Sequence, residues 1–414
     1  MKRFACLISA LLITTACAAP VATPLLGTPL PVASSAPAAA PTATAASSAL
    51  PSATPGATPS ATPTPTPTAA PPTPTPTAAP PTPGPTLVRG GQVTLVTHDS
   101  FAASDPVIHD FETQSGQTLK VLKGGDAGVM VNQAILTKTD PLGDVLYGVD
   151  NTFLSRALDA GIFVPYVSPA SASVAQEFKL DPLNRVTPID FGDVCIVYDV
   201  KSAGGTGAAQ PPQTINDLTN PTYKSTLVVE NPATSSPGLA FMLATIVRFG
   251  ESGDYTWLDY WRDLRANDVL VVSDWNDAYY NEFSGGGSGG NRPFVVSYAT
   301  DPAADVYFGG GQSTTPGVQK VDDGCFRQIE FAAVLAGAKN PAGAQAWVDY
   351  MASPEFQSDI PLNMFVFPVN PNAQVPDLFA KFAAQATNPL TMDPQTISAN
   401  RDRWIQQWTD TVIH

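Results

Sequence analysis

Two patterns of hydrophobic residues alternate along residues 89–414. Short runs rich in Val, Leu, Ile and Thr predict strands, and apolar residues spaced three or four apart predict helices. The predicted strands are 92–97, 119–122, 144–147, 191–200, 225–230, 269–273 and 294–298. The predicted helices are 105–115, 129–137, 151–159, 238–249, 276–283, 342–351, 354–360, 376–386 and 394–413. Because strands alternate with helices, we expect βαβ units, a parallel sheet and an α/β fold.

A body of this length exceeds what one hydrophobic core usually supports, so we expect two lobes. The approximate boundaries are 89–187 plus 300–320 for one lobe and 188–299 plus 321–414 for the other. Ligands of α/β proteins bind beyond the carboxyl ends of the strands. Polar and aromatic residues follow four predicted strands, at 98–101, 150–151, 273–275 and 298–301. These loops are expected to meet at one cleft.

The N-terminus has the layout of a secretory leader. A basic start at Lys2 and Arg3 precedes a short apolar run and then small residues, and the run is too short to span a bilayer. Cys17 after Thr-Thr-Ala is similar to a lipoprotein cleavage site, although Thr14 stands where such sites usually carry Leu. We expect a leader at 1–17 and a lipid anchor on Cys17, with ordinary cleavage after Ala18 as the alternative.

Residues 18–88 contain no Asp, Glu, Lys or Arg and hold 20 of the 42 prolines of the chain. Such a segment buries too little apolar surface to fold, so we expect an extended linker. The remaining body is acidic, with 36 Asp and Glu against 19 Lys and Arg outside the leader. This balance argues against nucleic-acid binding, which needs basic patches. Three histidines and four cysteines make a zinc site improbable, and we expect no metal or other cofactor.

Cys195 and Cys325 are the two cysteines of the body. Exported cysteine pairs in an oxidising compartment commonly form disulfides, so we expect this pair to be bonded. The alternative is two free buried thiols.

Eight motifs follow one another through the body: VTHDSF (96–101), YGVDNTFL (147–154), TPIDFGDVCIVYD (187–199), NPATSSPGLAF (231–241), DWNDAYYNEF (274–283), VVSYATDPA (295–303), GCFRQIEFAAVLAGAKNP (324–341) and PLNMFVFPVNP (361–371). In this combination and order they resemble the thiamine-binding solute receptors of bacterial ABC importers. The resemblance implies a two-lobed periplasmic-binding-protein fold of type II. Its lobes would close about a hinge, which we place near 187–193 and 295–301. It further implies a non-enzymatic, extracytoplasmic receptor that delivers thiamine or its phosphates to a membrane permease. We expect a monomer.

Thiamine is a fixed cation with two flat rings, and aromatic faces attract such cations. Trp275, Tyr279 and Tyr298 follow or end predicted strands and are candidates for an aromatic wall. By resemblance, Phe365 adds a ring where the family commonly has Trp. Asp99 is placed near the ligand by the same resemblance, with a helix cap or turn as the structural alternative. The remaining candidate ligand-binding residues are Ser100, Asp150, Asn151, Thr234, Ser235 and Asp301.

Several candidates have structural alternatives. Asp150 and Asn151 are explained equally well as a cap for the next helix. Ser235 and Thr234 match family hydroxyls that touch the hydroxyl or phosphate end of the ligand. For the neighbouring Ser236, we expect capping of the helix that follows.

The sequence leaves two alternative functions open. The Tyr279–Tyr280 doublet is similar to the phenolate ligands of ferric-ion receptors, and polyamine receptors share the fold. A secreted hydrolase is the second alternative, although the sequence shows no recognisable nucleophile or metal cluster.

Overall fold

The computed structural model describes residues 89–203 and 210–414. The predicted leader, the linker and Cys17 lie outside these residues. The strands are β1 (Gln92–Thr97), β2 (Thr118–Lys123), β3 (Val145–Asp150), β4 (Thr187–Asp199), β5 (Leu227–Glu230), β6 (Leu270–Val272), β7 (Phe294–Tyr298), β8 (Val318–Lys320), β9 (Phe326–Val334) and β10 (Phe367–Pro368). The α-helices are α1 (Asp105–Ser115), α2 (Ala127–Leu136), α3 (Leu154–Ala160), α4 (Ser236–Phe249), α5 (Trp257–Ala266), α6 (Asp301–Phe308), α7 (Pro341–Met351), α8 (Pro354–Asn363), α9 (Asp377–Phe382) and α10 (Pro394–Val412). Short 3₁₀ segments and a π-helical turn, η5 (Asp277–Glu282), complete the elements.

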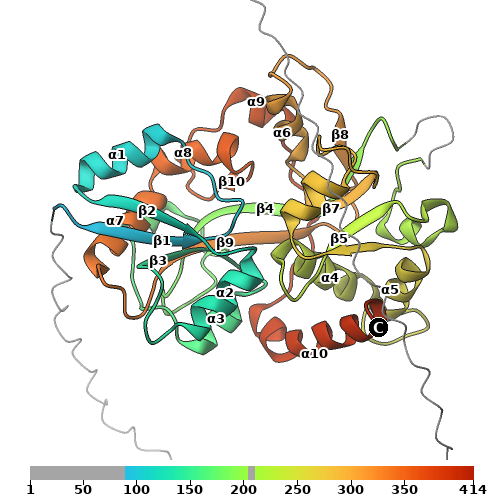
Figure 1. Ribbon diagram of the computed structural model, residues 1–414, viewed down its shortest axis with the longest axis horizontal. Coiled ribbons are helices and arrows are strands. Elements are labelled where there is room, and N and C mark those ends of the chain that lie inside the picture. Colours follow the sequence, from blue (N-terminus) through green and yellow to red (C-terminus); the bar gives the residue numbers. More distant parts are fainter. Residues whose placement is uncertain (1–88, 204–209) are drawn as a thin grey trace, which may run out of the picture. The chain divides into compact units, whose positions relative to one another are not determined.

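One mixed sheet runs through the body in the order β2-β1-β3-β9-β4-β7-β5-β6, and β8 and β10 pair with β4. The strands β1, β2 and β3 are mutually parallel, as are β5, β6 and β7. We call β1–β3 and their helices the first half, and β5–β7 and their helices the second half (Figure 1). The parallel pairing expected from βαβ units is therefore present in each half.

Two antiparallel strands, β4 and β9, connect the halves. The start of β4 pairs with β9 and its end pairs with β7, while the end of β9 pairs with β3. The sequence placed the second connecting strand at 295–301, which is wrong. The strand in that region, β7, pairs with β4 and β5 and with no other strand of the described residues. The connection lies in β9, whose polar cleft-facing residues hide its strand character.

Helices cover both faces of the sheet. In the first half, α1 and α8 lie on one side of the strands and α2 and α3 on the other (Figure 1). Helix α7 contacts β1 and α1, and α8 contacts α7 and α1. The expected lobe boundaries grouped these two helices with residues 188–299, but they pack with the first half. The final helix, α10, contacts both α3 and α5 and thus touches both halves.

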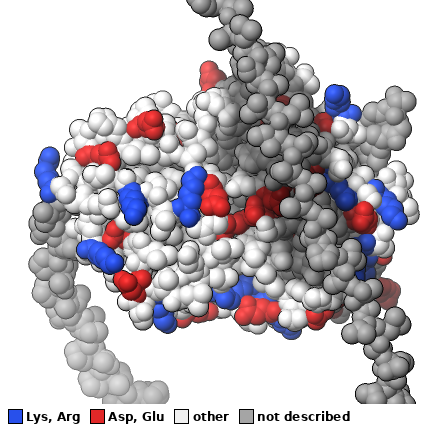
Figure 2. Space-filling model, in the orientation of Figure 1, with Lys and Arg blue, Asp and Glu red and all other residues white. Residues whose placement is uncertain are grey.

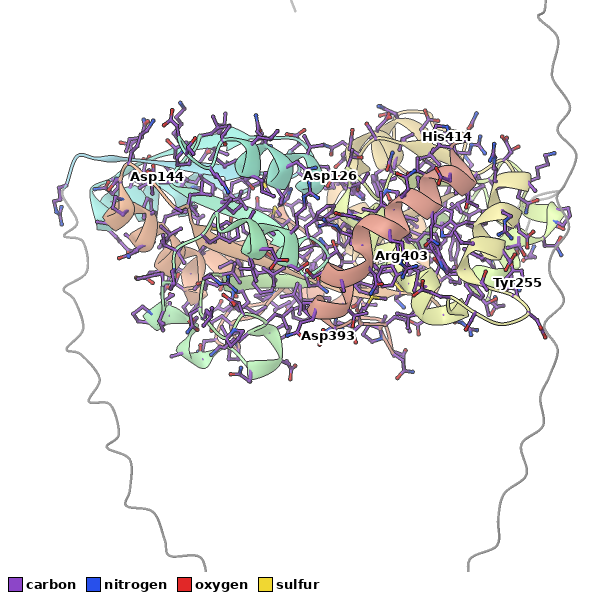
Figure 3. All side chains as sticks on the ribbon, turned by 90° about the horizontal axis from the view of Figure 1, so that it is seen from below. Asp126, Asp144, Tyr255, Asp393, Arg403 and His414 are labelled. Atoms are coloured by element: carbon purple, nitrogen blue, oxygen red, sulfur yellow. A yellow bond between two sulfur atoms is a disulfide. The ribbon has the colours of Figure 1, made fainter. Side chains whose placement is uncertain are left out.

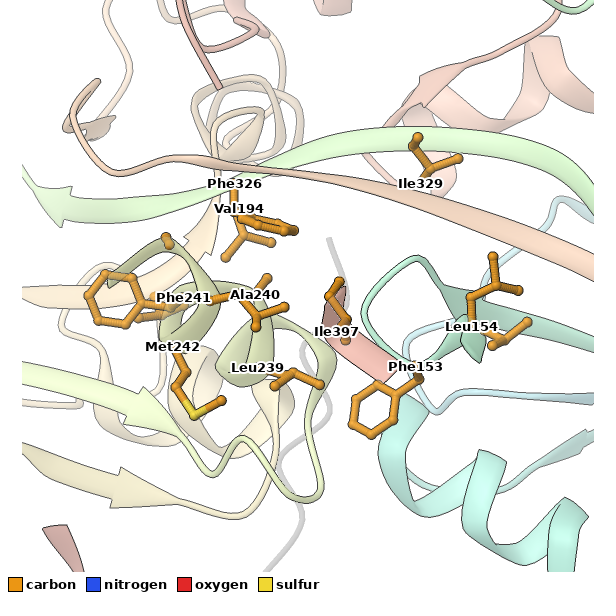
Figure 4. Close-up of a cluster of buried hydrophobic side chains, with 14 of the residues drawn as sticks. Phe153, Leu154, Val194, Leu239, Ala240, Phe241, Met242, Phe326, Ile329 and Ile397 are labelled. Atoms are coloured by element: carbon orange, nitrogen blue, oxygen red, sulfur yellow. The ribbon is translucent and has the colours of Figure 1, made fainter. Parts of the chain in front are cut away.

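The hydrophobic core follows this layering. The larger cluster gathers α3, α4 and the facing sides of β4 and β9, including Leu154, Leu239, Val194 and Phe326 (Figure 4). A second cluster joins β1 and β3 to α1, α7 and α8 around Trp347. Helices such as α4 and α7 turn their apolar faces to the strands, whereas α5 and α10 bury theirs against other helices. The core-facing helices could be predicted from the sequence because burial of one helix face fixes the spacing of their apolar residues.

Cys195 and Cys325 form a disulfide that spans 130 residues of sequence. Cys195 lies in β4 and Cys325 directly precedes β9, so the bond joins the two connecting strands beside the second half. Both cysteines are buried. Among the described residues, no helix combines the length and the apolar character that crossing a membrane requires.

Candidate binding cleft

A cleft of about 640 Å³ lies between the two halves at the carboxyl ends of their parallel strands. Residues that follow β1 and β2 line it from the first half, and residues that follow β6 and β7 line it from the second. Acidic side chains gather in the middle of the visible face of the body, between the halves (Figure 2). Of the four loops that were expected to converge, those at 98–101, 273–275 and 298–301 contribute residues to the cleft, and residues 150–151 do not.

An aromatic wall lines the second-half side of the cleft. The Trp275 ring stacks on Tyr279 at 5.0 Å with an interplanar angle of 23°, and meets Tyr280 edge-on at 5.5 Å. Tyr298 lies 6.3 Å from Trp275. The Trp275 indole N–H donates to Ser297 Oγ at 2.9 Å, which fixes the orientation of the ring. The predicted wall residues Trp275, Tyr279 and Tyr298 are therefore side by side, and Tyr280 joins them.

A second aromatic group borders the cleft. The Phe365 ring lies 5.3 Å from Phe308 and 5.6 Å from Tyr307. Phe365 has a φ of 54°, a left-handed conformation that is strained for a bulky residue. The Thr300 hydroxyl donates to the Phe365 carbonyl and helps to hold it. Phe308 lines the cleft while 73% of its surface is exposed.

The charged lining of the cleft is strongly acidic. Its carboxyl groups belong to Asp99, Asp126, Asp190, Asp274, Asp301, Asp305 and Glu330. Lys123 is the one lysine or arginine among the described residues that line it, and its ammonium donates to the Asp99 carbonyl at 2.7 Å. Burial raises the pKa of Asp301 to about 7. An acidic and aromatic lining is complementary to an organic cation.

Asp126 from the first half reaches the second half. Its carboxylate caps α2 at Ala127 and also accepts the backbone N–H groups of Ser236, at 3.3 Å, and Trp275, at 3.2 Å. Burial is the main cause that raises the pKa of Asp126. Figure 3 shows Asp126 in the middle of the body. The same side chain therefore joins α2, the start of α4 and the aromatic wall.

The N-cap of α4 lies one residue earlier than the sequence predicted. Ser235 is the N-cap and its hydroxyl accepts from the Gly238 N–H at 3.5 Å. Ser236, which we expected to be the cap, lines the cleft, and its hydroxyl accepts from Gln328 Nε2 at 3.1 Å. Pro237 accordingly occupies the second helical position rather than the first.

Seven of the predicted ligand-binding residues line the cleft together: Asp99, Ser100, Trp275, Tyr279, Tyr298, Asp301 and Phe365. Four others do not line it: Asp150, Asn151, Thr234 and Ser235. Their polar groups instead form hydrogen bonds within the protein.

Asp150 Oδ1 accepts from the Thr152 hydroxyl at 2.7 Å and from the Phe153 N–H at 3.2 Å. Asn151 exchanges hydrogen bonds with the backbone of β9 at Arg327 and Ile329. The Thr234 hydroxyl donates to the Ser273 carbonyl at 2.6 Å. These contacts hold loops and strand ends behind the cleft.

The residues at the floor of the cleft were not predicted from the sequence. Asp190 and Gly192 of β4 and Gln328 and Glu330 of β9 line it from the connecting strands. A Cβ at Gly192 would stand 3.1 Å from the Tyr298 ring, so glycine leaves room for that side chain. Asp190 and Glu330 could have been recognised from the sequence as acidic residues within otherwise apolar segments. Among the described residues, no group of His, Cys, Asp or Glu is arranged to hold a metal ion.

An α/β body with two halves, two connecting strands and a lined cleft between them defines a ligand-binding receptor. Residues 140–387 match the family model described as bacterial extracellular solute-binding protein. The chain belongs to this family. Membership confirms the predictions of a binding protein rather than an enzyme and of a location outside the cytoplasm. It does not test the lipid anchor on Cys17.

Named relatives add detail. The thiamine-binding periplasmic protein of Escherichia coli K12 is 29% identical over 325 residues, which cover 77% of this chain and 93% of the relative. The solved structure titled periplasmic thiamin binding protein is 27% identical, has a TM-score of 0.65, and aligns with 79% of this chain and 99% of its own. Iron-bound HitA from Pseudomonas aeruginosa, at 19% identity and a TM-score of 0.58 over 77% of this chain and 99% of its own, shows the fold alone. The type II periplasmic-binding-protein fold is thereby confirmed.

Proposed function

We propose that the protein captures thiamine, or a thiamine phosphate, in this cleft and delivers it to the permease of an ABC importer. The observation that carries the proposal is the Trp275–Tyr279–Tyr280–Tyr298 wall in an acidic cleft. Each aromatic face contributes about 0.5–2 kcal/mol to the binding of a cation. The relatives named for thiamine binding support the same ligand.

Capture by this fold proceeds through closure of the two halves on the ligand. β4 and β9 are the segments that would flex, and Asp126 supplies contacts that form between the halves. The leader and a lipidated Cys17 would hold the receptor at the outer side of the membrane. Labelling with a lipid precursor in a bacterial host, compared between the full chain and Cys17→Ser, tests the anchor.

Calorimetric titration of the full-length protein with thiamine tests the ligand, after unfolding and refolding to remove any ligand carried through purification. We expect saturable binding with a Kd below about 1 μM. Trp275→Ala removes the central ring of the wall and is expected to weaken binding at least about tenfold, whereas Trp275→Phe keeps a ring and weakens it less. Tyr255→Ala, an exposed aromatic outside the cleft, is the matched control.

The same protein distinguishes the alternatives. An absence of heat up to millimolar thiamine would refute the thiamine proposal. A visible absorption band on addition of ferric iron, lost in Tyr279→Phe, would instead assign the protein to the ferric-ion receptors. Parallel titrations with thiamine monophosphate and diphosphate show whether the protein binds thiamine or one of its phosphates most tightly.

A further inference from the structure

Two carboxyl groups face each other at the floor of the cleft. Asp190 of β4 and Glu330 of β9 are register partners in the antiparallel ladder, and both line the cleft. Asp190 is fully buried and Glu330 is 8% exposed. The Tyr147 hydroxyl lies between them, within hydrogen-bond reach of Asp190 Oδ2 and 3.2 Å from Glu330 Oε2. One hydroxyl proton therefore serves two acceptors.

No lysine or arginine among the described residues forms an ion pair with either group. Arg327 and its partner Asp193 belong to the opposite face of the same ladder, where the guanidinium binds the Asp193 carboxylate. The nearest basic group is His98, whose Nε2 lies 3.8 Å from Glu330 Oε2. Burial, aided by the charge of Lys123, lowers the pKa of His98 to about 4, so this ring is neutral at neutral pH.

The other titratable neighbours add no positive charge. Asp150 from β3 raises the pKa of Glu330, and Tyr298 from β7 faces Glu330 as a neutral phenol because burial raises its own pKa. Burial raises the pKa of both Asp190 and Glu330, and the proximity of Asp190 raises that of Glu330 further. Two adjacent carboxyl groups in such a place hold one proton between them.

One oxygen of this pair receives no hydrogen bond from a backbone, hydroxyl or amide group. This oxygen is the buried Asp190 Oδ1, and His98 Nε2 beside Glu330 likewise makes no hydrogen bond. An unpaired buried acceptor is costly unless a ligand completes it. Asp190 Oδ1 has no exposed surface, but the residue lines the cleft, so a ligand bound there lies next to the pair.

We infer that the Asp190–Glu330 pair is the counter-charge for the ligand's cationic ring, and that the pair loses its shared proton when that ring binds. This inference rests on the proposed function and assigns the cation of the ligand to the cleft floor. In the step, the carboxyl O–H bond breaks, the proton passes to solvent, and the positive charge of the ligand replaces it. The net charge at the floor is the same before and after binding, because one positive charge, that of the ligand, replaces another, that of the proton. This exchange favours a ligand with one positive charge over a neutral solute.

The test is calorimetry of the full-length protein with thiamine in two buffers of different ionisation enthalpy. We expect release of up to about one proton per ligand near neutral pH, and about tenfold weaker binding at pH 5.5 than at pH 8. In Glu330→Gln and in Asp190→Asn a single carboxyl group remains, and it ionises without its neighbour. Both variants should bind thiamine with little proton release and a flatter pH profile. Asp140→Asn, an exposed carboxyl outside the cleft, is the control for lost charge.

The outcomes separate the two proposals. Tight thiamine binding without proton release, or release unchanged in both variants, would overturn the inference and leave the function intact. If thiamine does not bind, the function is wrong, and the pair is examined in the ligand-free protein by infrared spectroscopy. A protonated-carboxyl band near neutral pH that disappears in Glu330→Gln supports the inference, and its absence overturns it.

Discussion

At the scale of single residues, the cleft combines groups that sequence patterns reveal and groups that they hide. Trp275 and Tyr298 were predictable because they follow strands, where ligands of α/β folds bind. Asp190 and Glu330 were not, since neither follows a strand that the sequence pattern predicted. The exchange of roles between Ser235 and Ser236 depends on a one-residue shift of a helix start, which local propensity does not resolve.

Asp150 is a buried carboxyl group whose contribution to stability depends on pH. Burial raises its pKa to about 7, and its Oδ2 has no partner. Between its ordinary pKa near ~4 and about 7, the folded state binds more protons than the unfolded state, so the free energy of unfolding falls as pH rises. Asp150→Asn should remove this part of the slope, about 2 kcal/mol between pH 5 and pH 7.

Urea denaturation of the wild type and Asp150→Asn at several pH values measures this slope. Asn keeps an oxygen that can accept from Thr152 and Phe153, so the turn before α3 is retained. Asp140→Asn accounts for the change in net charge. Parallel stability curves for the wild type and Asp150→Asn would show that Asp150 is ionised throughout this range.

At the scale of elements, the sequence located most helices and strands to within a few residues. Each has an apolar stripe or run of its own, and burial enforces that period. β9 was missed because Arg327, Gln328 and Glu330 interrupt its apolar run, and α6 because its start was interpreted as a loop. Gln328 and Glu330 thus line the cleft and at the same time interrupt the apolar pattern that would have revealed β9.

Helix α2 meets the second half at a glycine. A Cβ at Gly128 would lie 2.6 Å from the Thr234 carbonyl oxygen and 2.8 Å from the Phe153 ring. Gly128→Ala should therefore force α2 away from Thr234 and weaken the Asp126 contacts between the halves. We expect at least about tenfold weaker thiamine binding, although alanine favours the helix itself.

Calorimetry and small-angle scattering of the variant test this expectation. Gly124→Ala is the matched control, because its Cβ would meet the flexible Gln133 side chain at 3.4 Å. Unchanged affinity and an unchanged ligand-bound radius of gyration in Gly128→Ala would show that the close approach of α2 is not needed for capture.

At the scale of the whole molecule, the connecting strands and α10 join the two halves, and the disulfide links the connecting strands to each other beside the second half. The bond between Cys195 and Cys325 closes a long loop of 130 residues. Disulfides of this kind stabilise proteins by about 2–4 kcal/mol, mainly through the unfolded state. The double variant Cys195→Ser with Cys325→Ser should lose stability of this size and retain thiamine binding with altered closure.

Denaturation with and without reductant measures the loss, and scattering with and without thiamine measures closure. The reduced wild type should match the double variant, which separates the bond from the effect of the serines. If the double variant keeps both its stability and its normal closure, the bond does not fasten the connecting strands.

The discontinuous first half has a consequence for the order in which the chain becomes structured. β3 pairs with β9, and α7 packs against β1. In the sequence, these partners follow residues 145–150 and 92–97 by roughly 180 and 250 positions. A chain that crosses a membrane from its N-terminus onward therefore leaves that edge of its sheet open until almost the whole body has passed. Because the sheet is completed late, the polypeptide stays unfolded enough to be exported. Until β9 and α7 have crossed the membrane, the open sheet edge exposes the partly exported chain to proteases and aggregation.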